Sequence, residues 1–424
     1  MSDWKSVKLG DVAKITMGQS PSSSTYNEFG YGLPFLQGCA DFGPKYPIKK
    51  VYCSDPLKIA ESNSILISVR APVGALNIAD TKYCIGRGLA GILGTSVDQA
   101  FLNYLISANI YKLESQSQGS TFAAINSGDL SNLSLKIPET KETQRKIADI
   151  LGTVDDLIEK TEAAIDKYHA IKAGMMQDLF TRGIDTQTGK LRPTIEEAPE
   201  LYKESKLGWI PKEWDVTDFD DVIKEYFDFR GKTPLKLGMN WGGGSIKAIS
   251  ANNIEPGFIN FNKEHYLASE DLYRAWMNHG DCSKGDVVMT SEAPLGVVAQ
   301  IPDNNKYILS QRVFLFKVKP SSITNDYLYY LMNTDRFQND LQRQSSGSTV
   351  TGIQQARLAR IRMQLTRSLE EQLHISKILK SIDLGISDNK EMLSKYKNLK
   401  HGLMADLLTG KVRVNLNDNK VEKG

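Results

Sequence analysis

The sequence predicts an α+β fold with an internal repeat: two mixed α/β domains separated by two long helices that pack as an antiparallel coiled coil, with pseudo-two-fold symmetry. Three observations predict it. Glu142–Thr181 and Glu370–Thr409 align without a gap and share 15 of 40 positions, whereas unrelated segments would share roughly two or three. Both segments carry apolar residues at alternating steps of four and three. Before each of them, strand-like runs such as SILISV and DVVMTS mix with short helical patterns, as in α+β domains.

Each copy of the repeat is predicted to be one long helix with a coiled-coil seam. The apolar spacing averages 3.5 residues, and no proline interrupts either copy. The predicted seam consists of Ile147, Leu151, Val154, Ile158, Thr161, Ile165, Tyr168, Ile375, Leu379, Ile382, Ile386, Asn389, Leu393 and Tyr396. Two unrelated amphipathic helices would explain the seam but not the shared register. We expect antiparallel packing, with the polar Thr161 and Asn389 near each other.

Fainter matches extend the repeat to the segments before the helices. Trp4–Val12 matches Trp214–Val222, RAPVG at Arg70–Gly74 matches EAPLG at Glu292–Gly296, and GST occurs twice. The linker contains two prolines and no apolar periodicity, which is typical of a surface connector. We therefore expect a domain, a helix, a linker, a domain, a helix and a tail with the bounds 1–138, 139–181, 182–206, 207–366, 367–409 and 410–424.

Composition places few limits on function. The formal net charge of the 424 residues is +2, so a nucleic-acid binder would need local basic patches or a basic companion subunit. The four cysteines are scattered, without a C-x-x-C pair, and we expect reduced thiols in a cytosolic protein. No apolar run reaches the roughly 18 residues of a membrane helix, and the first residues lack a signal-peptide core. We expect neither secretion nor a membrane span.

Motifs of catalysis are missing from the sequence. It has no phosphate-binding P-loop, no G-x-G-x-x-G between a strand and a helix, and no Asp/Asn-Pro-Pro-aromatic tetrapeptide of amino-methyltransferases. Glu139-Thr-Lys141 has the E-x-K spacing of a nuclease metal site. That tripeptide is common by chance, and here it leads into a helix whose first turn favours acidic residues. A duplicated plan without a catalytic motif or a metal site favours a recognition scaffold.

These features together resemble the specificity subunit of type I restriction-modification enzymes. The resemblance covers essentially the whole chain. It rests on the duplicated unit, the paired long helices, GWIPKEWDV before the second unit, and the GST segment before each helix. Its most specific element is the pair of helix starts with the pattern E-x-Q…I…IL…D, at Glu142–Asp155 and Glu370–Asp383. One departure is that the Gly-x-Ile-Pro-x-x-Trp pattern precedes Trp214 but not Trp4, so we expect the first domain to borrow from the C-terminal tail.

The resemblance implies a non-catalytic subunit that binds double-stranded DNA. Each domain would be a target-recognition domain that reads half of a bipartite, asymmetric sequence, and the helices would set the spacing and dock methyltransferase subunits, expected to be two, that methylate adenine. Restriction/translocase subunits would join through the complex, which would be cytoplasmic and bind no membrane. The chain itself would hold no cofactor, with S-adenosylmethionine, ATP and Mg²⁺ on the partner subunits.

The candidate DNA-binding residues are polar or basic residues of predicted loops, because base edges are read by Arg, Lys, Asn and Gln. In the first domain they are Gln19, Ser20, Lys45, Tyr46, Lys49, Lys50, Arg70 and Arg87. In the second they are Lys232, Thr233, Asn252, Asn253, Gln311 and Arg312. The Ser/Thr pairs of the two GST segments could contact phosphates or could simply cap a helix: Ser120, Thr121, Ser348 and Thr349.

Two other classes of function stay open on the sequence alone. One is a coiled-coil interaction scaffold with two adaptor domains and no role on DNA, which salt-dependent binding to duplex DNA would exclude. The other is an enzyme with an unrecognised motif, which methyl transfer by the purified chain alone would support.

Overall fold

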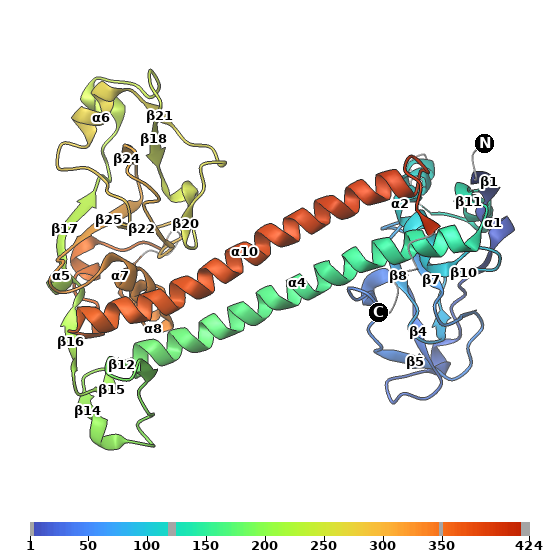
Figure 1. Ribbon diagram of the computed structural model, residues 1–424, viewed down its shortest axis with the longest axis horizontal. Helices are drawn as coiled ribbons and strands as arrows, with labels where there is room; N and C mark the ends of the chain where they lie inside the picture. The colour runs from blue at the N-terminus through green and yellow to red at the C-terminus, as the bar shows by residue number, and fades with distance from the viewer. Residues whose placement is uncertain (1–3, 118–123, 347–350, 417–424) are drawn as a thin grey trace, which may run out of the picture. The chain divides into compact units, whose positions relative to one another are not determined.

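The computed structural model describes residues 4–117, 124–346 and 351–416. The chain forms two compact units (Figure 1). Unit 1 comprises residues 1–163 and 390–424, and unit 2 comprises residues 164–389. Each unit thus contains one mixed α/β domain and a part of both long helices.

Unit 1 is built on three small sheets. The first strand of the chain, β1 (Trp4–Lys8), pairs antiparallel with β11 (Ser134–Pro138), the last strand before the first long helix. A four-stranded sheet has the order β2 (Ala13–Met17), β10 (Leu89–Gly94), β7 (Ile65–Ser68), β8 (Leu76–Ile78). A five-stranded sheet has the order β3 (Tyr26–Asn27), β5 (Val51–Cys53), β4 (Leu33–Leu36), β9 (Tyr83–Ile85), β6 (Ile59–Ala60). The domain is completed by three helices, α1 (Leu9–Val12), α2 (Gln99–Ser117) and α3 (Ser127–Ser131).

Unit 2 repeats this plan with insertions. Its strand β16 (Trp214–Asp218) pairs antiparallel with β26 (Arg362–Thr366). The four-stranded sheet has the order β17 (Ile223–Asp228), β25 (Val313–Val318), β22 (Val287–Thr290), β23 (Val298–Gln300), which matches the sheet of unit 1. A second sheet has the order β21 (Leu267–Ala268), β18 (Ile246–Ile249), β24 (Tyr307–Leu309), beside the hairpin of β19 (Ile254–Glu255) and β20 (Phe258–Ile259). The helices are α5 (Phe219–Val222), α6 (Glu270–Trp276), α7 (Asn325–Met332), α8 (Asp335–Gln344) and α9 (Gln355–Leu358).

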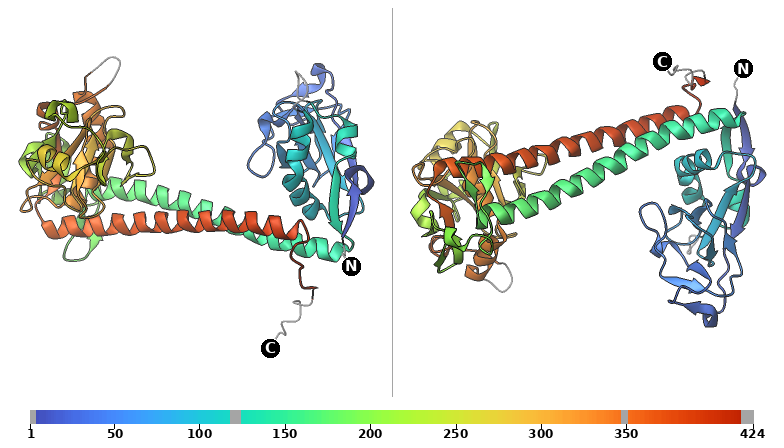
Figure 2. Two further views of the ribbon diagram at one scale, coloured as in Figure 1. Left: turned by 90° about the horizontal axis from the view of Figure 1, so that it is seen from above. Right: turned by 60° about the horizontal axis from the view of Figure 1, so that its bottom comes forward.

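The two long helices are α4 (Lys141–Thr181), green in Figures 1 and 2, and α10 (Leu369–Leu407), red. They run antiparallel within each unit. In unit 1 Asp155 of α4 pairs with Lys400 of α10 at 2.6 Å and is joined by the Tyr104 hydroxyl at 2.7 Å. In unit 2 the roles are exchanged, because Asp383 of α10 pairs with Lys172 of α4 at 2.5 Å. There the Tyr330 hydroxyl donates to Asp383 at 2.8 Å, completing the same Tyr–Asp–Lys group. The same group therefore occurs once in each unit, with the parts played by α4 and α10 exchanged, as the internal repeat predicted.

A buried glutamine at each helix start connects the helix to its own domain. Gln144 accepts a hydrogen bond from the backbone of Asp98 at 2.8 Å and donates to Pro138 at 2.9 Å. Gln372 accepts from the backbone N–H of Thr324 at 2.9 Å and donates to the backbone carbonyls of Ser322 and Thr366. The glutamine of the E-x-Q pattern thus satisfies backbone groups that burial would otherwise leave unpaired.

All the predicted seam residues are buried or half-buried. Within each unit the seam joins the core of the domain, through Ile147 and Leu151 in unit 1 and Ile375 and Leu379 in unit 2. Thr161 and Asn389 each hydrogen-bond to a carbonyl of their own helix. They belong to different units, so their proximity stays a prediction.

The C-terminal tail completes unit 1, as the missing pattern before Trp4 predicted. Leu407 and Leu408 at the end of the second helix lie in the core of unit 1, and Val414 of the tail packs against it. Gly410 has φ +74°, and a Cβ there would come within 2.8 Å of the Trp4 indole. In unit 2 the segment after α4 contacts Trp214 in the same way.

The linker departs from the surface connector that the sequence predicted. It contains the hairpin of β12 (Ile184–Asp185) and β13 (Lys190–Leu191), and then β14 (Tyr202–Ser205), which pairs with β15 (Gly208–Pro211). Ile184 and Tyr202 are buried. The sequence did not reveal this order because the group that binds Ile184 N, the carboxylate of Glu371, lies far away in the sequence at the start of α10.

Candidate nucleic-acid interface

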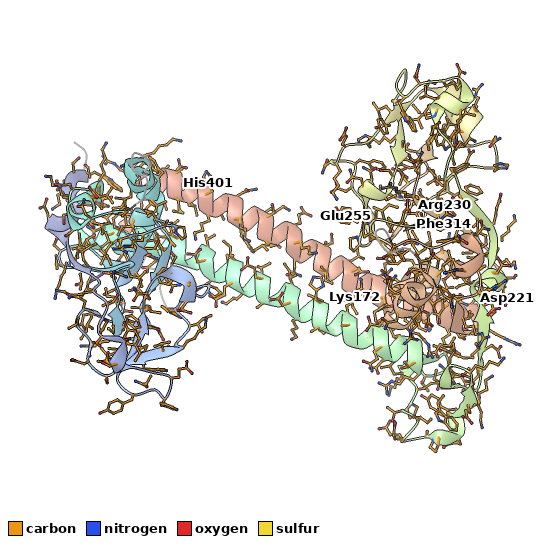
Figure 3. The ribbon with its side chains drawn as sticks, turned by 180° about the vertical axis from the view of Figure 1, so that it is seen from behind. Lys172, Asp221, Arg230, Glu255, Phe314 and His401 are labelled. Atoms are coloured by element: carbon orange, nitrogen blue, oxygen red, sulfur yellow. The ribbon has the colours of Figure 1, made fainter. Side chains whose placement is uncertain are left out.

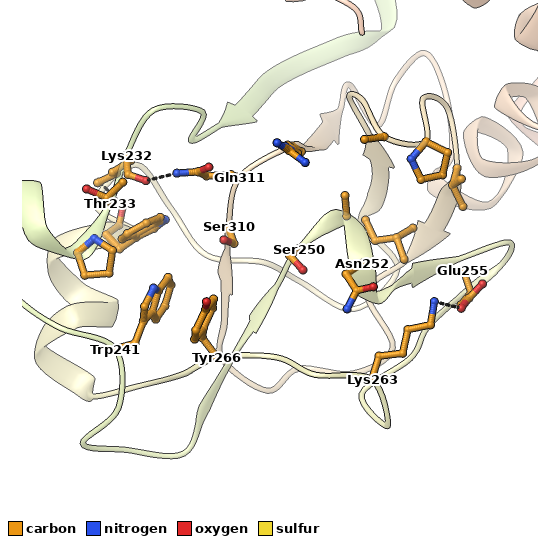
Figure 4. A pocket seen from close by; sticks show the side chains of 18 of the residues that line it. Lys232, Thr233, Trp241, Ser250, Asn252, Glu255, Lys263, Tyr266, Ser310 and Gln311 are labelled. Atoms are coloured by element: carbon orange, nitrogen blue, oxygen red, sulfur yellow. Dashed lines mark hydrogen bonds and ion pairs between the residues drawn. The ribbon is translucent and has the colours of Figure 1, made fainter. Parts of the chain in front are cut away.

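The second domain has a cleft of about 930 Å³ at the ends of its sheet strands (Figure 4). Its lining mixes amides, hydroxyls, cations and aromatic rings. Trp241 and Tyr266 stack on one wall, with ring centroids 5.0 Å apart and an interplanar angle of 9°. Lys263 pairs with Glu255 on the other side. The predicted candidates that line this cleft are Lys232, Thr233, Asn252, Gln311 and Arg312.

Two of these candidates, Asn252 and Gln311, have exposed side-chain amides that are weakly hydrogen-bonded within the protein. Asn252 and Gln311 each make one long hydrogen bond of 3.5 Å, to the carbonyl of Glu264 and of Lys232 respectively. Thr233 accepts from Lys236 N at 3.3 Å and caps a short turn. Since an amide can pair in a bidentate way with adenine N6 and N7, Asn252 and Gln311 suit base reading.

Lys232 and Arg312 are more strongly held. The Lys232 ammonium donates to the carbonyl oxygen of Trp276 at 2.6 Å, and burial lowers the pKa of this lysine. The Arg312 guanidinium pairs with Glu292 at 2.9 Å. Arg230, which sequence reasoning did not select, is held between Asp228 and the ring of Phe314, 4.5 Å away (Figure 3).

Asn253 is fully buried, unlike its neighbour Asn252, and the structure argues against it as a base-reading residue. Its side-chain oxygen accepts from Ser250 N at 3.1 Å, and its amide donates to the carbonyl of Glu264 at 3.2 Å. The sequence could not separate the two asparagines, because only the tight turn after β18 decides which side chain points inward.

This pair of asparagines provides a matched test. Asn253→Ala is expected to cost about 1–3 kcal/mol of stability, because buried backbone groups lose their partners. Asn252→Ala is expected to change stability by less than about 0.5 kcal/mol and to weaken binding to cognate DNA by about 1–3 kcal/mol. Urea unfolding and titration with labelled duplex measure the two effects. Equal loss of stability in both variants would contradict the assignment.

Four candidates of the first domain gather at one end of its four-stranded sheet. The Ser20 hydroxyl lies 3.4 Å from the backbone nitrogen of Arg87, and Gln19 N donates to the carbonyl of Ile85. Arg70 follows β7, and Val69 N donates to Gly88 O at 2.9 Å, so the two arginine-bearing loops are adjacent. Gln19, Arg70 and Arg87 are exposed.

The basic loop at Lys45–Lys50 is separate from this group and carries its own counter-charges. Lys49 pairs with Asp80 and Lys50 with Asp41, both at 2.7 Å. Lys45 lies near Glu159 and 5.8 Å from the centroid of the Tyr46 ring. Exposed pairs of this kind are weak and can exchange for phosphates.

The Ser/Thr pairs at Ser120, Thr121, Ser348 and Thr349 lie outside the described residues. In the described part of the chain, no group of three or more His, Cys, Asp or Glu side chains is placed to hold a metal ion. Across residues 4–117, 124–346 and 351–416, none of the helices is long and apolar enough to cross a membrane.

Comparison with known proteins agrees with this arrangement. The family model described as type I restriction modification DNA specificity domain matches residues 1–167 and 211–395. A Methanocaldococcus jannaschii protein named as a type I restriction enzyme MjaX specificity subunit is 45% identical over 190 residues, which cover 44% of either chain. The MjaVIII specificity subunit of the same organism is 26% identical over 98% of this chain and 94% of its own.

The fold is also similar to that of a solved protein. The crystal structure of a type I restriction-modification S subunit from M. genitalium aligns with a TM-score of 0.62 over 96% of both chains. Its sequence identity is 14%, so this similarity concerns the fold.

Proposed function

Since the chain belongs to the type I restriction-modification DNA specificity family, we propose that it reads a bipartite, asymmetric DNA sequence, with one half-site for each of its two domains. It is the non-catalytic specificity subunit of such a complex. Its two specificity domains occupy most of units 1 and 2.

The observation that supports this proposal is that both domains share the arrangement of their four-stranded sheet and long helices but differ in the residues of their loops. The four-stranded sheets share their strand order, and the Tyr–Asp–Lys groups repeat residue by residue. The loops at the sheet ends differ: the register of β10 and β25 places Arg87 and Gly88 where the second domain has Gln311 and Arg312. Two equal frames with unequal loops suit a target whose halves differ in sequence.

Catalysis is assigned to partners. We propose that two methyltransferase subunits, each with S-adenosylmethionine, dock on the exposed faces of α4 and α10 and flip out the adenine to be methylated. Restriction/translocase subunits with ATP and Mg²⁺ would join through them, in the cytoplasm. A nearly neutral chain would gain much of its DNA affinity from these partners.

The helices are also proposed to act as a spacer that sets the gap between the half-sites. The antiparallel ion pairs within each unit fix the register of α4 against α10. A rigid helical pair would hold a constant distance, and hence a constant number of unread base pairs.

Methylation mapping tests the proposed function directly. The chain is co-expressed with the methyltransferase encoded beside it, and methylated adenines in host DNA are located by sequencing. We expect one motif with two defined halves, a constant gap, and no methyl transfer by the purified chain alone. Absence of any motif, together with DNA binding that is absent at all salt concentrations, would favour the interaction scaffold instead.

A further inference from the structure

Each domain has a loop with the same hydrogen-bond pattern directly after an inner strand of its four-stranded sheet, β7 in the first domain and β22 in the second. We call residues 69–75 the first Ala-Pro loop and residues 291–297 the second. The residue before each loop, Ser68 or Thr290, donates its hydroxyl to the carbonyl of the loop proline at 2.5 Å. The same hydroxyl oxygen accepts the last backbone N–H of the loop at 2.9 Å. The two loops are therefore closed by the same hydrogen bonds, and their residues correspond one to one.

The second residue of the loop reverses its charge between the domains. It is Arg70 in the first domain and Glu292 in the second. The neighbouring loop corresponds as well, because the first backbone N–H of each Ala-Pro loop donates to the carbonyl of Gly88 or Arg312 at 2.9 Å. The two positions thus face each other in both domains.

In the second domain, the residue that faces Glu292 is Arg312, and the two charges neutralise each other. Arg312 pairs with Glu292 at 2.9 Å. In the first domain Gly88 offers no side chain, and within the described residues Arg70 has no ion-pair partner. Arg87, beside Gly88, is likewise exposed and without a carboxylate in that part of the chain. Among the described residues, the first domain therefore presents two guanidinium groups without an ion-pair partner on adjacent loops.

The reversal of charge favours a base contact over a phosphate contact at this position. A position that touches the DNA backbone would need the same positive sign in both domains, because phosphates are present at every step of any sequence. A glutamate there would repel them. A position that meets a base edge can change sign, since arginine pairs with guanine O6 and N7 whereas glutamate accepts from cytosine N4.

We propose that Arg70 is a base-reading residue that requires a guanine in the half-site of the first domain, with Arg87 beside it on the same base step. This inference rests on the proposed function and assigns the chemistry of one of its reading positions. The planar fork of arginine suits guanine, whereas lysine at the same place would supply a point charge without bidentate geometry. The loop closure by Ser68 holds Arg70 in place before DNA arrives.

The test uses the complex with its methyltransferase partner and the mapped target. Dissociation constants are measured for R70A, R70K and wild type on three kinds of duplex: the cognate target, a set of targets with 7-deazaguanine at one guanine of the first half-site each, and unrelated DNA. We expect R70A to weaken cognate binding about 10- to 100-fold, with unrelated DNA changed about twofold or less. At one guanine, 7-deaza substitution should weaken wild type and leave R70A unaffected. R70K should restore little.

The outcomes separate the two levels of the proposal. Equal loss on cognate and unrelated DNA would make Arg70 a phosphate contact, and unchanged binding would remove it from the interface; either overturns the assignment while the bipartite motif stands. A wild-type complex that methylates no defined motif overturns the proposed function and this assignment with it. E292A serves as a matched control, because it should alter discrimination only in the other half-site. Unchanged melting temperatures exclude misfolding, since Arg70 is exposed.

Discussion

Replacing Glu371 with alanine is expected to lower the free energy of unfolding by about 3–5 kcal/mol. Glu371 lies in the first turn of α10 and is 1% exposed. Its carboxylate pairs with Arg192, accepts from Ile184 N at 2.9 Å and accepts from the Trp214 indole at 3.2 Å. One carboxylate thus connects α10 to the linker and to strand β16 of the second domain. Its removal takes the close counter-charge from the half-buried Arg192 guanidinium, and the nearest other carboxylate, that of Glu213, lies 3.8 Å away.

Two controls identify the cause of this loss. Glu370→Ala removes an exposed carboxylate one residue earlier and should cost about 1 kcal/mol or less. The double variant Arg192→Met with Glu371→Gln should lose less stability than the two single changes added together, because no unpaired charge stays buried. Urea unfolding followed by circular dichroism measures Glu371→Ala, Glu370→Ala, the double variant and its two single changes. A Glu371→Ala protein as stable as Glu370→Ala would contradict the role assigned to this carboxylate.

Lengthening both helices by one heptad is expected to lengthen the gap between the half-sites by about three base pairs. Insertions after Thr161 in α4 and after Leu393 in α10 lie at matching levels, since the neighbouring Glu162 pairs with Lys397 at 2.8 Å. A heptad keeps the seam in phase and adds about 10 Å, and DNA advances about 3.4 Å per base pair. The half-sites would also rotate by about 100° about the duplex, so weaker binding should accompany the longer gap.

The control for this change is a heptad in α4 alone. It shifts the Tyr–Asp–Lys groups out of register and should reduce stability and methylation together. Mapping of methylated sites decides the result for the doubly extended variant. A longer gap with both half-sites unchanged supports the spacer, and an unchanged gap in an active variant rules it out.

The long helices and the repeat could be predicted because their signals are periodic and local. The 3.5-residue spacing identified every seam residue, including the polar Thr161 and Asn389. All of these residues are buried or half-buried. The shared pattern also selected Asp155 and Asp383, and the structure supplies the reason, which is the lysine of the other helix. A pattern that occurs twice at a fixed offset needs no knowledge of tertiary contacts.

The contacts that could not be predicted join residues far apart in the sequence. Arg192 and Glu371 are separated by 179 positions, and neither stands in a recognisable motif. The order in the linker therefore escaped prediction. The same limit applies to the loops, where Lys232 is held by the carbonyl at the end of α6 and Asn253 is buried by its own turn. Charge and polarity in the sequence select candidate residues, but only the packing shows which of their side chains are available to bind DNA.

If each domain reads its own half-site, exchanging one domain should exchange one half of the recognised sequence. Residues 2–137 are replaced by the corresponding domain of a related specificity subunit. The donor must keep an indole at Trp4 and a hydroxyl at Tyr104, because these contact Gly410 and Asp155. Methylated sites are then mapped in cells that express the exchanged chain with the methyltransferase. We expect a motif in which one half is new while the other half and the gap are unchanged. A change in both halves, or in neither, would contradict it.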